Sequence, residues 1–171
     1  FNVMEGALVQ NWGDMTFSNN LQVKGELINH YHLTCVGDAQ TQVSGIIKNY
    51  CQMYVTSTKS TAMQIVTGTV ASPGFVNGPN AYLKVTGEIS FSGQGYGNLG
   101  LQSLIETGTF NISGNVAGPS TQGSQIHATG SGKSQTAASC VLTGYIDLWS
   151  TNFNPQNGNY GPNVTKHTTG I

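Results

Sequence analysis

The chain has 171 residues, enough for one domain with a buried core, and only 8% of its residues are charged, with no arginine among them. So few basic groups exclude a nucleic-acid partner and attraction to anionic lipid, and no apolar run reaches the roughly 18 residues of a membrane-spanning helix. A surface with so little charge also lacks self-repulsion, which favours association with further copies of the chain or a coat of glycans.

The chain begins at Phe1, and we expect a mature extracellular or cell-surface protein whose signal peptide has been removed. Residues 1–14 are apolar and strand-like and precede the first clear turn. We predict an N-terminal arm that serves as a donor strand for a neighbouring subunit. Two-residue alternation divides its side chains between two faces, giving these assembly residues: Phe1, Val3, Met4, Ala7, Leu8, Val9 and Trp12.

Residues 15–150 alternate between apolar and polar side chains, and turn signals such as Ser72-Pro73-Gly74 separate the runs. Strands of this kind with no helices between them predict an all-β domain. We expect an antiparallel β-sandwich, jelly-roll or pilin-like, with a core over 15–150. The segment M-T-F…V-K-G-E-L…T-C, from Met15 to Cys35, resembles the first strand of donor-strand pilins, although its cysteine spacing differs from the common pattern.

A five-residue frame, aliphatic-x-Gly-x-aliphatic, occurs six times, as in V-T-G-E-I at residues 85–89. Alternation places each glycine on the buried face of a strand, where it leaves a notch for a large side chain from the facing sheet. The glycines are separated by 20, 23, 19, 27 and 30 residues. This irregular spacing argues against a β-solenoid, because a solenoid repeat holds a fixed period.

Three cysteines, Cys35, Cys51 and Cys140, fall on apolar faces, and in a secreted sandwich two of them would form a disulfide whose pairing the sequence leaves open. His30 and His32 point to the same side of a strand, so they are weak metal-site candidates or simply two solvent-facing histidines. No other metal site and no cofactor are expected.

Catalytic groups are sparse. The seven carboxylates are scattered and no nucleophile elbow occurs, so we expect no enzymatic activity and assign no catalytic residue. Two sequons, at Asn111 and Asn163, are candidates for N-glycosylation.

Residues 151–171 are rich in Asn, Gly and Pro and predict an extended C-terminal tail. Aromatic and amide side chains gather around its start and are typical of carbohydrate sites: Trp149, Asn152, Phe153, Asn157 and Tyr160.

These observations favour a structural subunit of an extracellular assembly, such as a pilus or filament protein that polymerises with copies of itself by β-strand addition. The alternative is a secreted glycan-binding, lectin-like sandwich or a small ligand-binding barrel.

Overall fold

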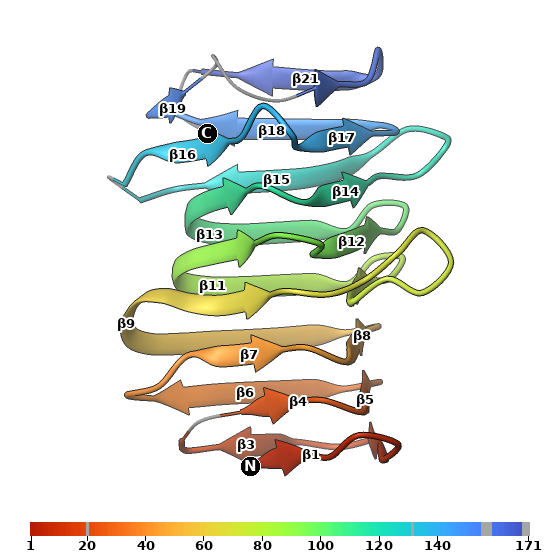
Figure 1. Cartoon of the computed structure of the whole chain (residues 1–171), viewed down its shortest axis with the longest axis vertical. Coiled ribbons are helices and arrows are strands. Elements are labelled where there is room, and N and C mark those ends of the chain that lie inside the picture. Colours follow the sequence, from red (N-terminus) through yellow and green to blue (C-terminus); the bar gives the residue numbers. More distant parts are fainter. Residues whose placement is uncertain (20, 131, 155–158, 169–171) are drawn as a thin grey trace.

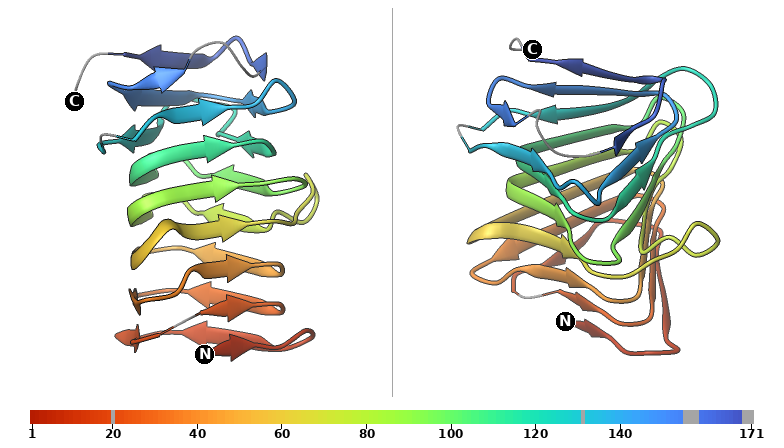
Figure 2. Two further views of the ribbon diagram at one scale, coloured as in Figure 1. Left: turned by 60° about the vertical axis from the view of Figure 1, so that its left-hand side comes forward. Right: turned by 45° about the horizontal axis from the view of Figure 1, so that its top comes forward.

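The computed structural model describes residues 1–19, 21–130, 132–154 and 159–168, apart from the side chains of 153 and 154. They form a parallel β-solenoid of eight coils, and each coil contributes strand segments to three faces that run the length of the molecule (Figures 1 and 2). The expected antiparallel sandwich, jelly-roll or pilin-like, is therefore wrong. Every pair of named strands is parallel, and within the described residues the one isolated antiparallel bridge joins Gly68 to Pro73.

Face 1 is a separate sheet of eight short strands. These are β2 (Leu8–Asn11), β5 (Glu26–Asn29), β8 (Ile46–Asn49), β10 (Phe75–Asn77), β12 (Tyr96–Leu99), β14 (Asn115–Ala117), β17 (Val141–Thr143) and β20 (Asn159–Tyr160).

Faces 2 and 3 belong to one bent sheet of 13 strands. Face 2 is made by β3 (Met15–Phe17), β6 (His32–Gly37), β15 (Ser124–Ala128), β18 (Ile146–Ser150) and β21 (Val164–His167). Face 3 is made by β1 (Asn2–Val3), β4 (Gln22–Val23), β7 (Thr41–Val43), β16 (Ser134–Thr136) and β19 (Phe153–Asn154). The long strands β9 (Gln52–Ile65), β11 (Tyr82–Phe91) and β13 (Leu104–Ile112) cross from face 2 to face 3.

The core lies along the axis of the solenoid. On face 2, for example, Leu33, Met53 and Leu83 occupy equivalent positions in successive coils, and all three side chains are fully buried. Neighbouring strands lie about 4.8 Å apart, so like side chains stack directly on one another. The apolar alternation in the sequence thus identified the inward positions, although it was assigned to the wrong sheet arrangement.

Most of the recurring glycines lie at corners, not inside strands. Gly25, Gly45 and Gly114 each connect face 3 to face 1. A Cβ at any of them would collide with the backbone of the preceding coil, such as the carbonyl oxygen of Gly25 for Gly45. Gly87 lies within β11, at the bend between faces 2 and 3, with a positive φ of 112°. The expected notches for facing side chains are therefore wrong for these positions.

The irregular glycine spacing has a simple origin. The frames lie at different corners, and residues 66–74 and 118–123 extend two of the coils as loops. The register continues past both loops, since β8 pairs with β10 and β14 pairs with β17. A solenoid can thus keep its pairing while its repeat length varies, which overturns the argument from spacing.

Both chain ends take part in the solenoid. Residues 1–14 supply β1 and β2, and β20 and β21 lie within 151–171, so the expected arms do not stand apart from the core in the described part. Within the same residues, no helix is long and apolar enough to cross a membrane.

Candidate assembly surface at the first coil

The first coil, residues 1–17, exposes one edge of the solenoid. Its strands β1, β2 and β3 pair only with strands of the second coil, so among the described residues nothing covers their outer edges. The carbonyl oxygens of Ala7 and Asn11 accept hydrogen bonds from Glu26 and His30 of the second coil. Because alternate residues of a strand turn to opposite edges, Leu8 and Gln10 direct their N–H and C=O groups away from the molecule.

Apolar side chains are exposed on the same coil. Phe1, Met4, Leu8 and Trp12 are 53%, 61%, 55% and 72% exposed. The other members of the predicted donor strand face inward: Val3 is buried, and Ala7 and Val9 pack against the core of their own chain. The segment therefore completes the solenoid of its own chain. Its other apolar side chains remain exposed: Phe1, Met4, Leu8 and Trp12.

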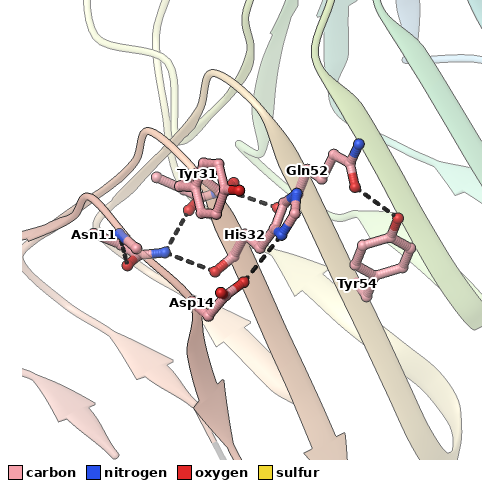
Figure 3. Close-up of polar contacts among 8 residues, drawn as sticks. Asn11, Asp14, Tyr31, His32, Gln52 and Tyr54 are labelled. Atoms are coloured by element: carbon pink, nitrogen blue, oxygen red, sulfur yellow. Dashed lines mark hydrogen bonds and ion pairs between the residues drawn. The ribbon is translucent and has the colours of Figure 1, made fainter.

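A ladder of buried asparagines lies on the corner between faces 1 and 2 and begins in this coil at Asn11, which is labelled in Figure 3. The Nδ2 atoms of Asn11, Asn29 and Asn49 each donate to the Oδ1 of the next asparagine, the last being Asn77, over 2.7, 2.8 and 2.8 Å. At the open end, Asn11 Oδ1 accepts the backbone N–H of Gly13 at 3.2 Å. The Gly13 N–H thus caps the ladder at the first coil.

An aromatic stack runs beside the ladder on the outside of the corner. The Trp12 ring lies 3.7 Å from that of His30 at an interplanar angle of 8°, and His30 lies 5.8 Å from Tyr50. Trp12 ends the stack and remains largely exposed. A flat aromatic surface is therefore available next to the open edge.

The two histidines proposed as weak metal ligands have separate environments. His30 lies in the aromatic stack, where its Nε2 is shielded and has no hydrogen-bond partner among the described residues. His32 lies on face 2, with Nδ1 3.0 Å from Asp14 Oδ1 (Figure 3). In the described part of the chain, no group of three or more His, Cys, Asp or Glu side chains is arranged to hold a metal ion.

The opposite end of the solenoid has a different chemistry. Tyr160 and Val164 cover the last coil of the core. Lys166 occupies the inward position that pairs with Leu148, and its Nζ lies 4.2 Å from the centre of the Tyr160 ring. In the described part of this end an exposed cation therefore lies beside the last coil, whereas apolar groups occupy the first coil.

The three cysteines are free thiols, so the single disulfide expected between two of them is not present. Cys35 faces the core, and burial raises its pKa to about 12, partly offset by a hydrogen bond with Thr41. Burial likewise raises the pKa of Cys140 to about 11. Buried neutral thiols of this kind act as small apolar side chains.

Among the described residues, the predicted glycan-binding side chains Trp149 and Tyr160 lie on different faces. Trp149 lies outward on face 2, where its ring stacks on His167 at 3.7 Å. Tyr160 extends from face 1, and its hydroxyl lies 2.6 Å from Thr136 Oγ1. Asn152 is exposed, whereas the side chain of Phe153 and all of Asn157 lie outside the described residues.

The two sequons occupy different surroundings. Asn111 is half-buried within β13 on face 3, whereas Asn163 is exposed in the turn before β21.

A row of polar side chains lies on the outside of face 2, and the sequence alone does not reveal it. Tyr82 donates a hydrogen bond to Glu106 at 2.7 Å, and Lys84 lies 3.6 Å from the same carboxylate. Burial, then the bond to Glu106, raises the pKa of Tyr82 above its usual range. The row joins residues about 20 positions apart, which become neighbours only once the register between coils is known.

Comparisons with known proteins give no relative: no family model, no curated protein and no solved structure matches the chain.

Proposed function

We propose that the protein is a structural subunit that associates with a second copy of itself by β-strand addition at the first coil. The observation that carries the proposal is the coincidence of an open strand edge with exposed Phe1, Met4, Leu8 and Trp12. Open parallel edges pair readily with further strands, and natural proteins usually cover them or protect them with charge. The first coil carries few charges, with Glu5 and Asp14 as its only ionisable side chains.

The charge at the two ends supports contact between first coils. If the first coil met the last coil of another copy, the Lys166 ammonium would be buried, which costs several kcal/mol for an unpaired charge. Two first coils instead bring apolar groups together, with the two β2 strands antiparallel across a two-fold axis. This arrangement gives a closed pair, whereas the sequence had suggested an open polymer.

A proline at Gln10 tests the proposal. Gln10 is exposed and its N–H points to the open edge, so Gln10→Pro removes one donor needed for strand addition and leaves the internal ladder intact. In analytical ultracentrifugation over rising concentration, we expect the unmodified chain to dimerise and Gln10→Pro to stay monomeric. Gln10→Ala is the matched control, because it loses the same side chain but keeps the N–H, and it should dimerise.

Equal urea midpoints for the two variants, measured where both are monomeric, would show that proline leaves the fold intact. A chain that stays monomeric at every concentration would refute the proposal, as would dimerisation of Gln10→Pro with the affinity of Gln10→Ala. The extracellular location and the absence of enzymatic activity remain predictions from the sequence.

A further inference from the structure

We infer that a groove over face 1 binds a neutral carbohydrate, independently of the assembly surface. The groove has a volume of about 680 Å³, within the range of small-molecule sites. Its floor is the outward row Tyr96, Asn115 and Val141, which occupy equivalent positions in three successive coils. Its wall is the loop of residues 66–74, which Figure 2 shows projecting from the stack of coils.

The loop is held in place before any ligand arrives. A bridge joins Gly68 to Pro73, the Thr69 N–H donates to the Ser72 carbonyl at 2.9 Å, and Thr69 Oγ1 accepts from the Ser72 N–H at 3.1 Å. The Tyr96 N–H donates to the Thr67 carbonyl at 3.1 Å, which ties the loop to β12. A preformed wall reduces the entropy cost of binding.

The residues that line the groove indicate which kind of ligand it can bind. None of the described residues that line the groove is charged, so a charged ligand would lose its hydration without compensation there. Tyr96, Val70 and Val141 offer an aromatic ring and aliphatic groups, and Thr143 adds a hydroxyl. This mixture matches a sugar ring, which presents C–H groups on its faces and hydroxyls around its rim.

Two side-chain amides in the groove have no hydrogen-bond partner among the described residues. They belong to Gln94, which is exposed, and Asn115, which is half-buried. An amide offers both donors and acceptors, which suits the paired donor and acceptor character of hydroxyl groups. Uncharged amides and one tyrosine therefore favour neutral oligosaccharides over acidic ones.

Titration calorimetry with a panel of neutral hexose and pentose oligosaccharides, and uronic-acid oligosaccharides for comparison, tests the inference. We expect at least one neutral member to bind and the acidic members to be rejected. Tyr96→Ala and Asn115→Ala should each weaken binding by about tenfold, the effect of losing roughly 1.4 kcal/mol of contact. Tyr96→Ala keeps the Cβ that packs beside Gly68, so circular dichroism should show an unchanged fold.

Two variants outside the groove serve as controls. Tyr145→Ala removes an exposed tyrosine that does not line it, and Trp149→Ala removes the centre of the cluster predicted from the sequence. Both should bind as the unmodified chain does. Loss of binding in Trp149→Ala alone, binding of acidic members only, or no binding across the panel would each overturn the inference. None of these outcomes depends on dimerisation, which Gln10→Pro reports separately.

Discussion

At the scale of single residues, buried asparagines hold one corner of the solenoid. Asn29 is fully buried, and the two N–H groups of its Nδ2 are shared among three acceptors, Asn49 Oδ1 and the carbonyls of Tyr31 and Gln52, at 2.8, 3.0 and 2.9 Å. One side chain thereby satisfies the backbone of two coils at a bend where strand pairing is interrupted. The ladder contributes to stability mainly because its loss would leave buried groups without partners.

Asn29→Ala should therefore lower the free energy of unfolding by about 3 kcal/mol, since several buried polar groups lose a partner at once. Asn98→Ala is the matched control, because Asn98 is exposed on the outside of face 1, and its effect should stay within about 0.5 kcal/mol. Urea unfolding of both monomeric variants measures the difference. Similar midpoints for the two variants would contradict a structural role for the ladder.

The positions of the buried asparagines can be read in the sequence. Alternation places Asn29 on the same face as Leu27, where an unpaired amide would be costly. Asn11, Asn49 and Asn77 likewise end short aliphatic strands. A recurring buried amide implies that the amides bond to one another, and in-register stacking is the arrangement that allows this.

At the scale of elements, the corners decide which fold the alternating strands adopt. A two-residue period fixes which side chains face inward, but it is the same for antiparallel and parallel sheets. The inward positions were therefore predictable, whereas the direction of pairing was not. The corner glycines carried the missing information, since Gly45 approaches the backbone of the coil before it too closely for any side chain.

Gly45→Ala should destabilise the protein by about 3 kcal/mol, near the upper range for overpacking, because the added Cβ meets backbone atoms of Lys24 and Gly25 that cannot rotate away. Gly13→Ala provides the control: nothing lies within 4 Å of its added Cβ. That change should leave stability unaltered or raise it by about 0.5 kcal/mol through the unfolded state. If thermal unfolding showed equal losses for both, close approach at the corner would not explain the glycine.

At the scale of the whole molecule, each coil contacts mainly its neighbours, so the ends determine solubility and association. The two ends are chemically unequal, with exposed apolar groups on the first coil and Lys166 above the Tyr160 ring on the last. Sequence reasoning identified the apolar N-terminal segment, because its residues are local in the chain. It did not identify the loop groove on face 1, whose lining residues, from Gly68 to Thr143, lie up to 75 positions apart.

Hydrogen exchange at low and high protein concentration should separate the possible contacts between ends. If first coils meet, the amides of Leu8 and Gln10 gain protection as concentration rises, because they become donors to the partner's β2, while those of β21 exchange at an unchanged rate. The amides of the central strand β11, which pairs with β9 and β13, provide an internal reference. Their exchange rate should not change with protein concentration. In Gln10→Pro, the added protection at Leu8 should disappear. Concentration-dependent protection of β21 together with β2 would instead indicate head-to-tail stacking, and then the Lys166 ammonium would need a carboxylate partner across the interface to offset its burial.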